Sequence, residues 1–501
     1  MHIVARATLR TSAALVVVLL LLVVVRLPWV GDLGIHAATV TRLRHDLVDP
    51  GDPLVAADAP SPYYSPWTLF LGIIARITGL SVFVVLRIGA LISLALLVTG
   101  IRRYARTLST HRMAGPLAIL CVLFLWGPQV FEWSGFIGLN SLALSVAYPS
   151  AFALGLSFHF WAWLTAALRG GAGWGVFLGL GLLWAVILLS HQFSGVVASL
   201  GALGVVVGSR APRELWWRPA AGLALGLVVL AVWPYYDFFA LFGVSGLEAI
   251  HRPLYRELLP RYGLALLGVV ALGLRWRHDR RDPLVVFFTA GALMFAAGGL
   301  TGHYSWGRVL PAALIPAQLA AAAEAGRLSL RSAYTVLLGA ALLVGGWAQA
   351  GTLGYVTGRG VLPAPVAAKY KAPWAGYHWI TPWVRYGDVV LAKTLPSRQI
   401  PAYGAYTVAP GYPDVFLGDE QRRVSAVNRY FAPGTSPGER RHIVREYRVR
   451  WVVGAAGEGG SLVREVARGP RAGMDNLRRW REGLRPGTVR WGGANESRET
   501  R

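Results

Sequence analysis

A carboxylate and an imidazole lie four residues apart, directly after the first long apolar run of this chain. They are Asp32 and His36, in the segment Gly31-Asp32-Leu33-Gly34-Ile35-His36. A carboxylate in this place can act as a general base that takes the proton from an attacking hydroxyl. It can also be only a helix cap, a common role for Asp. His36 follows at helical spacing and either binds a substrate or simply lies at a membrane interface.

Two further polar groups interrupt apolar runs in the same way. His191 separates two of these runs, and Arg308 begins another. A lone histidine in such a place is often structural. Arg308 can snorkel to lipid headgroups, or its guanidinium can bind a phosphate through two hydrogen bonds. We favour phosphate binding.

An aromatic segment precedes Trp67, at a level where amphipathic rings suit the membrane surface. Two further candidates, His303 and Tyr304, lie shortly before Arg308, in the connection between two predicted spans. We predict Asp32 as the catalytic residue. The predicted substrate-binding residues are His36, Tyr63, Tyr64, His191, His303, Tyr304 and Arg308.

The other acidic residues of the first loop are predicted to be turn residues, because Asp49-Pro50-Gly51-Asp52-Pro53 is a dense turn signal. Their spacing does not indicate a metal site. The sequence also has no Gly-rich phosphate loop, no zinc-ligand spacing and no nucleophile elbow. We therefore predict no cofactor and no metal ligand, and leave a divalent cation open. The turn residues are Asp46, Asp49, Asp52 and Asp58.

The composition is that of a membrane protein. Hydrophobic residues make up 54% of the 501 residues and charged residues 15%, with a mean hydropathy of +0.47. A net charge of +24 would suggest nucleic acid in a soluble protein. Here the arginines gather in short loops and in the C-terminal tail, so we expect no nucleic-acid partner. Cys121 is the single cysteine, so a disulfide within the chain is excluded.

Apolar windows of the length needed to cross a bilayer predict about eleven spans in a mainly α-helical bundle. A signal peptide is the alternative for the first, but no small-residue cleavage site follows it. A shorter apolar stretch, Trp67–Leu80, is predicted to be interfacial or re-entrant. The windows are 11–30, 80–101, 114–131, 147–168, 173–190, 192–208, 218–237, 261–275, 284–302, 308–326 and 332–354.

The arginines of the short loops give this bundle a predicted orientation. They fall on one side of the membrane, which the positive-inside bias places in the cytoplasm together with the N-terminus. An odd number of spans puts the C-terminus outside. The arginines are Arg6 and Arg10; Arg102, Arg103, Arg106 and Arg112; Arg210, Arg213 and Arg218; Arg275, Arg277, Arg280 and Arg281; and Arg327 and Arg331.

We predict three parts of the chain. Residues 1–354 form the transmembrane domain, with a first outer loop at 31–66. Residues 355–467 form a small extracytoplasmic α/β domain, with strands near 388–392 and 450–454, helices at 419–431 and 436–447, and a parallel sheet. Residues 468–501 form a basic tail without apolar periodicity, which we expect to be disordered.

These features resemble the GT-C superfamily of polytopic glycosyltransferases, which includes protein O-mannosyltransferases, lipid A aminoarabinose transferases and arabinosyltransferases. The resemblance covers nearly the whole chain as architecture, with an early Asp in the first outer loop. Short segments also look alike: Gly31-Asp32-Leu33-Gly34-Ile35-His36, Ser190-His191-Gln192-Phe193, Trp306-Gly307-Arg308-Val309-Leu310-Pro311, Ile400-Pro401-Ala402-Tyr403-Gly404, Tyr412-Pro413-Asp414 and Tyr447-Arg448-Val449-Arg450-Trp451-Val452-Val453.

The resemblance implies an inverting enzyme that uses a polyprenyl-phosphate sugar donor and a glycan, lipid or protein acceptor, with Asp32 as the base. Many relatives carry adjacent acidic residues, whereas Leu33 follows Asp32 here, which puts metal dependence in doubt. Three rivals stay open: a transporter or flippase for lipid-linked glycans, an envelope assembly protein, and a ligase or polymerase. The absence of a clear internal repeat speaks against a transporter.

Overall fold

The computed structural model describes residues 2–243, 248–325, 327, 332–456 and 460–465. The chain divides into two compact units. The helical unit consists of Met1–His36 and Pro62–Ala375, and the C-terminal unit consists of Ala37–Ser61 and the described residues from Gly376 onward. The predicted basic tail, 468–501, lies outside the described residues.

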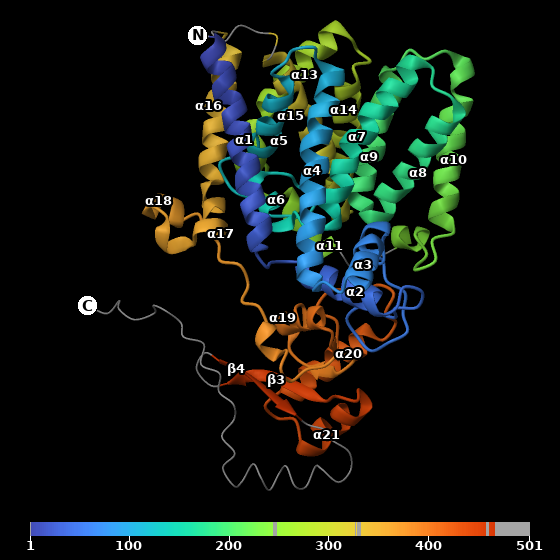
Figure 1. Cartoon of the computed structure of the whole chain (residues 1–501), viewed down its shortest axis with the longest axis vertical. Coiled ribbons are helices and arrows are strands. Elements are labelled where there is room, and N and C mark those ends of the chain that lie inside the picture. The colour runs from blue at the N-terminus through green and yellow to red at the C-terminus, as the bar shows by residue number, and fades with distance from the viewer. Residues whose placement is uncertain (1, 244–247, 326, 328–331, 457–459, 466–501) are drawn as a thin grey trace. The chain divides into compact units, whose positions relative to one another are not determined.

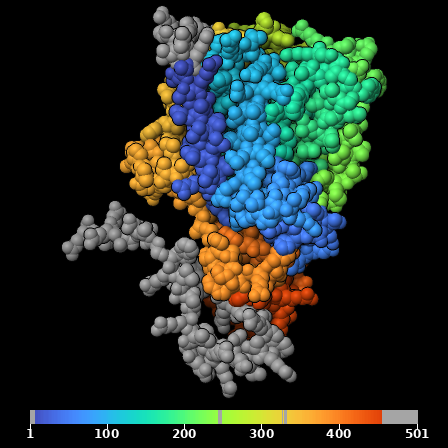
Figure 2. Space-filling view, in the orientation of Figure 1, coloured from blue at the N-terminus to red at the C-terminus, as the bar shows by residue number. Residues whose placement is uncertain are grey.

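Each of the eleven predicted apolar windows contains a helix, and in the helical unit these helices run side by side (Figure 1). The first of them, α1, lies beside α4 on the surface of this unit (Figure 2). The helices are α1 (His2–Arg26), α4 (Val82–Leu108), α5 (Ala114–Phe124), α7 (Pro149–Gly170), α8 (Trp174–Ser190), α9 (Gln192–Gly208), α10 (Trp217–Ala231), α13 (Leu266–His278), α14 (Pro283–Thr301), α15 (Pro311–Ala325) and α16 (Ala333–Ala348).

Shorter helices connect or flank these long ones. The segment predicted to be interfacial or re-entrant forms helix α3. Ser65 is the N-cap of this helix and forms a capping box. The short helices of the helical unit are α3 (Pro66–Thr78), α6 (Leu139–Ser145), α11 (Glu248–His251), α12 (Leu258–Tyr262), α17 (Gly354–Thr357) and α18 (Ala364–Ala367).

Not all of the long helices have the length and hydropathy of a full membrane span. Among the described residues six do, or seven if the pair Ala333–Ala348 and Ala350–Thr357, bent by 49°, is one span. Helices α5, α8 and α9 are apolar but shorter. The chain is therefore a mainly helical protein with several apolar helices, and the number of eleven crossings stays a prediction.

Glycines let neighbouring helices approach closely. A Cβ atom on Gly181 of α8 would lie 1.8 Å from the carbonyl oxygen of Gly222 of α10, and one on Gly100 of α4 would lie 2.8 Å from that of Gly155 of α7. Small residues at such crossings are typical of helices that associate inside a bilayer, where packing replaces the hydrophobic effect. Any larger residue at these two crossings would force the helices apart.

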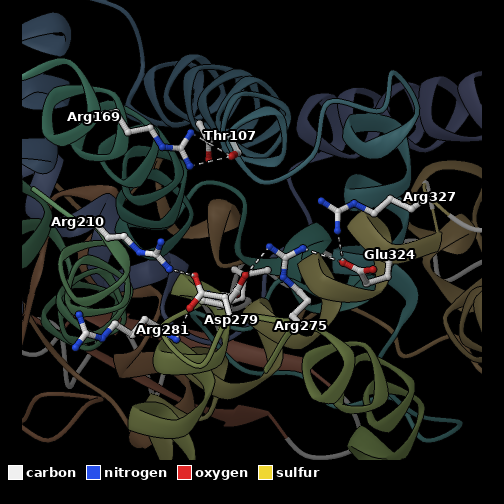
Figure 3. A network of polar contacts seen from close by, with 10 residues as sticks. Thr107, Arg169, Arg210, Arg275, Asp279, Arg281, Glu324 and Arg327 are labelled. Atoms are coloured by element: carbon white, nitrogen blue, oxygen red, sulfur yellow. Dashed lines mark hydrogen bonds and ion pairs between the residues drawn. The ribbon is translucent and has the colours of Figure 1, made fainter. Parts of the chain in front are cut away.

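At one end of the bundle, arginines and carboxylates connect three helices (Figure 3). Arg275 at the end of α13 lies 2.7 Å from Asp282, the N-cap of α14, and 2.9 Å from Glu324 in the last turn of α15. Arg327 also contacts Glu324, at 3.4 Å. We call this end, which holds the arginine-rich connections, the arginine end. Helix α8 leads from this end to His191, and α9 leads back to it.

The C-terminal unit contains a four-stranded sheet in the order β2-β1-β3-β4. Strand β1 pairs in parallel with β2 and β3, but β4 is antiparallel to β3, so the prediction of a parallel sheet is wrong for the last strand. The predicted helices are present as α20 and α21, and Ser436 caps the second one. The elements are β1 (Val389–Leu391), α19 (Thr394–Ser397), β2 (Tyr406–Thr407), α20 (Glu420–Phe431), α21 (Pro437–Glu446), β3 (Trp451–Ala456) and β4 (Gly460–Glu465).

Most of the first loop packs within the C-terminal unit, although the sequence analysis places it in the transmembrane domain. Helix α2 (Leu33–His45) begins in one unit and ends in the other. Its Arg42 is fully buried and donates to the carbonyl oxygens of Gly404 at 2.9 Å and Ala405 at 2.5 Å. Further along the loop, Val55 forms a parallel bridge with Thr407. These contacts explain why residues 37–61 group with the sheet.

Candidate functional site

Asp32 lies in the turn between α1 and α2, within the helical unit. The turn depends on Gly31, whose φ of +51° is in the left-handed region that favours glycine. The His36 N–H donates to the Asp32 carbonyl at 3.2 Å, as expected for a residue that directly precedes a helix. Asp32 is partly buried and lies directly before the first turn of α2. A carboxylate in this position can act as a general base.

Tyr148, which the sequence analysis did not single out, positions this turn. It is the N-cap of α7, and its hydroxyl donates to the carbonyl oxygen of Val30. Burial, and then the charge of Asp32, raise the pKa of Tyr148 well above its usual value, so the phenol stays neutral. In the sequence, the one feature that could have drawn attention to Tyr148 is its position directly before Pro149, where a helix begins on the predicted outer side.

His36 is buried between two tyrosine rings. Its ring centroid lies 4.9 Å from that of Tyr148 and 5.8 Å from that of Tyr63. Burial lowers the pKa of His36 to about 3, so the imidazole is neutral. Its Nδ1 is buried without a hydrogen-bond partner. In this state His36 contributes shape and a polar atom to the site, but no charge.

His191 is the single residue between α8 and α9, and it caps the second helix. Its Nδ1 accepts the backbone N–H of Ser194 at 3.1 Å. Burial, and then the nearby Arg308 and His36, lower the pKa of His191 well below its usual value. Because Nδ1 accepts this N–H, the neutral ring carries its proton on Nε2. His191 therefore presents a donor on the side away from α9.

Arg308 lies in a short 3-10 segment, η5 (Tyr304–Val309), between α14 and α15. Its guanidinium carbon lies 4.5 Å from the ring centroid of Phe193 and 5.6 Å from that of Trp133. Burial lowers the pKa of Arg308 to about 10, while the charge of Asp32 opposes this shift. Arg308 thus stays a cation at neutral pH, within the field of the Asp32 carboxylate.

Two donors converge at this place. The Arg308 Nη2 lies 3.3 Å from the His191 Nε2. In the tautomer that the Ser194 N–H on Nδ1 favours, Nε2 carries a proton, so both atoms are donors and an anionic oxygen can accept from both. Glu248 of α11 fixes the start of η5. Its carboxylate accepts two hydrogen bonds from Ser305, one from the backbone N–H at 2.9 Å and one from the side-chain hydroxyl at 3.0 Å.

Five of the predicted site residues lie in this one neighbourhood, and three others have their contacts elsewhere. Tyr64 is buried and packs against Tyr235, with ring centroids 5.6 Å apart. His303 is exposed and lies 2.8 Å from the Thr301 hydroxyl. The Tyr304 ring faces that of Tyr255 at 5.5 Å. The neighbourhood of Asp32, His36, Tyr63, His191 and Arg308 is called the Asp32 site below.

The Asp32 site contains one carboxylate and two neutral imidazoles. No group of three or more His, Cys, Asp or Glu side chains within the described ranges has an arrangement that could hold a metal ion. The chemistry that these side chains can carry out is proton removal by Asp32 next to a pair of donors that can bind an oxyanion.

The sequence matches no protein-family model and no curated protein sequence. Its structure is similar to that of the apo oligosaccharyltransferase from Archaeoglobus fulgidus, with a TM-score of 0.50 and 12% identity, over 88% of this chain and 69% of the other. It is also similar to the arabinofuranosyltransferase AftD from Mycobacteria, with a TM-score of 0.54 and 17% identity, over 89% of this chain. The chain spans only 35% of the length of AftD. The chain therefore shares the fold of these two glycosyltransferases.

Proposed function

We propose that this protein is an integral membrane glycosyltransferase that moves a sugar from a polyprenyl-phosphate-linked donor to an acceptor on the extracytoplasmic side. The observation that supports this most directly is the convergence of Asp32, His191 and Arg308, which come from three distant parts of the chain. A base beside a pair of oxyanion-binding donors is what displacement of a phosphate from a sugar requires. The likeness in fold to two glycosyltransferases supports the same reaction class.

In the proposed reaction a hydroxyl oxygen of the acceptor attacks the anomeric carbon of the donor sugar. The bond between that carbon and the phosphate oxygen breaks as the new bond forms, so the configuration inverts. Asp32 takes the hydroxyl proton, and polyprenyl phosphate leaves with the electron pair of the broken bond. The Arg308 guanidinium and the His191 Nε2–H stabilise the growing charge on the phosphate.

The proposed location explains why the donor is a lipid. Positive-inside bias places the arginine end in the cytoplasm and the Asp32 site, at the other helix ends, outside. Nucleotide sugars are not supplied there, so the activated sugar has to arrive attached to a membrane lipid. The acceptor is a glycan, a lipid or a protein, and we assign neither it nor the sugar.

The test is the replacement Asp32→Asn, which keeps the size of the side chain. The full-length protein would be reconstituted in liposomes with synthetic polyprenyl-phosphate pentoses and hexoses and a cell-envelope extract as acceptor. Release of polyprenyl phosphate would be followed by mass spectrometry. We expect a loss of about 10²–10⁴-fold in rate, the usual contribution of a general base. Asp58→Asn, in the exposed part of the first loop, is the matched control and should keep the native rate.

Two outcomes would contradict the proposal. A correctly inserted Asp32→Asn protein that transfers sugar at the native rate would remove Asp32 as the base. Movement of the intact donor across the liposome membrane without release of polyprenyl phosphate would favour a transporter instead.

A further inference from the structure

A groove between α7 and α8 lies outside the Asp32 site and has no role in the proposed reaction. Its volume is about 460 Å³. Its walls are apolar, with Trp163 and Ala166 on α7, Val176, Gly179 and Leu183 on α8, and Ala172 in the turn between them. This turn follows Arg169, so the groove opens near the arginine end.

The groove is hollow because small residues line its middle. A Cβ atom built on Gly179 would meet no other atom within 4 Å, so the space beside this residue is empty. Ala166 on the opposite wall is also exposed. Two neighbours outside the groove, Leu178 and Leu182, are exposed on α8 by 36% and 47%. A surface of this kind on an apolar helix faces lipid chains rather than water.

Cations lie at the edge of the groove. The guanidinium carbon of Arg103, on α4, lies 5.0 Å from the ring centroid of Trp163, which is itself a lining residue. Arg169 lies at the end of α7, with its Nη2 3.4 Å from the Thr107 carbonyl oxygen, as Figure 3 shows. Both arginines are exposed. The described structure thus places positive charge directly beside an apolar groove.

A third arginine contacts the turn that lines one end of the groove. Arg218 of α10 donates to the carbonyl oxygens of Gly171 at 3.1 Å and Ala172 at 2.6 Å. These hydrogen bonds fix the turn between α7 and α8 and use this guanidinium for structure. The exposed Arg103 contacts Trp163 in the wall of the groove, so its guanidinium can pair with a ligand that enters the groove.

We propose that the groove binds one acyl chain of an anionic phospholipid, whose phosphate pairs with Arg103. Inside a bilayer the hydrophobic effect does not favour a chain in the groove over a chain in the surrounding lipid, so close packing against the walls has to supply the preference. The pairing of guanidinium and phosphate adds selectivity for an anionic headgroup. This lipid site is independent of the proposed sugar transfer.

The proposal is tested by native mass spectrometry of the full-length protein in detergent. Palmitoyl-oleoyl phosphatidylglycerol and the phosphatidylcholine with the same two chains would be added at equal concentration. We expect the wild type to retain one phosphatidylglycerol molecule at least tenfold more than phosphatidylcholine. Gly179→Leu fills the groove and should remove this adduct, and Arg103→Gln should abolish the preference between the two lipids.

A matched control separates filling of the groove from a general effect of a larger residue. Gly339 of α16 is also exposed on an apolar helix, with no atom within 4 Å of an added Cβ, so Gly339→Leu should retain the lipid as the wild type does. If Gly179→Leu does not insert, Ala166→Leu fills the groove from the other wall. Equal retention of both lipids by the wild type would overturn the proposal. So would an undiminished adduct in either filled variant.

Discussion

The Nε2 atom of His191 and the Nη2 atom of Arg308 lie 3.3 Å apart, although 117 residues separate the two in the chain. The helix cap fixes the orientation of the imidazole, and the rings of Phe193 and Trp133 flank the guanidinium. A single oxygen atom can therefore meet both donors without rearrangement of either side chain. Pre-organised donors of this kind stabilise a developing charge more than mobile ones do.

Replacement of Arg308 by Lys should weaken use of the donor. Lysine keeps the charge but loses the planar fork that binds a phosphate in two hydrogen bonds and stacks on aromatic rings. We expect the KM for the polyprenyl-phosphate donor to rise about tenfold, which corresponds to ~1.4 kcal/mol, while the KM for the acceptor stays the same. Arg252→Lys, at an exposed arginine near Tyr304, is the control. A rise in the acceptor KM alone would show that Arg308 does not bind the donor phosphate.

Replacement of Tyr148 by Phe should lower kcat rather than weaken binding of the donor. The change removes the hydrogen bond to the Val30 carbonyl, and with it one restraint on the turn that carries Asp32. One hydrogen bond contributes about 1 kcal/mol, so we expect kcat to fall by roughly fivefold. Steady-state kinetics with the purified protein would check this. An unchanged kcat with a raised donor KM would instead place Tyr148 in substrate binding.

Replacement of Arg42 by Met should destabilise the C-terminal unit. The buried guanidinium donates to three carbonyl oxygens, including that of Pro53 at 3.4 Å, and lies 3.6 Å from the Tyr406 ring centroid. Methionine fills part of the space but leaves these oxygens buried without a donor. We expect a loss of roughly 3 kcal/mol in the free energy of unfolding. Faster hydrogen exchange in β1 and β2 would report it.

The matched control is Arg385→Met, at an exposed arginine of the same unit. It removes an equal charge but none of these buried hydrogen bonds. Equal exchange rates in the two variants would show that Arg42 contributes only its charge.

The stability of the C-terminal unit should fall as the pH rises from about 4 to about 8. Asp52 is fully buried, and burial together with the neighbouring Asp414 raises its pKa from 3.8 to about 8. The folded state therefore holds a proton that the unfolded state has released, and each step up in pH within this range favours unfolding. Glu420 faces Asp414 as well, and its pKa is also raised, first by burial.

The variant Asp52→Asn resembles the protonated form at every pH. Its side-chain oxygen can still accept the N–H groups of Leu54 and Val55, which lie 2.8 and 2.7 Å from the carboxylate. We expect a flatter pH profile and a more stable unit at pH 8, measured by hydrogen exchange. Asp58→Asn should leave the profile as it is. A profile that stays steep in Asp52→Asn would assign the effect to Asp414 or Glu420.

Hydropathy predicted where the helices lie because each apolar run is local. It could not separate full spans from shorter helices. Helix α5, for example, is surrounded by protein along most of its length, so its hydrophobicity reflects burial in the bundle. The sheet was predicted from two strands, and the antiparallel partner β4 lies in a segment, Gly460–Glu465, that gave no signal.

For the Asp32 site the sequence was informative where a polar residue interrupted or began an apolar run. Arg308 is an arginine on the predicted outer side, where the positive-inside bias does not expect one, and His191 separates two apolar runs. Tyr148 and Arg42 were missed because their partners are distant in sequence, and a tyrosine or arginine beside a helix has no local feature that reveals them. Asp52 was correctly predicted to be a turn residue, but the turn uses only one of its oxygens, and the neighbour Asp414 could not be foreseen.

The burial of Arg42 also has a consequence for how the chain is made. Its carbonyl partner Gly404 lies 362 residues further on, so a ribosome adding about 5–20 residues per second needs on the order of 20–70 s to produce it. During that time residues 37–61 have already been synthesised, but the strands against which they pack have not. The C-terminal unit therefore completes only after Gly404 has been synthesised, and a chain that stops before Gly404 leaves this arginine without its acceptors.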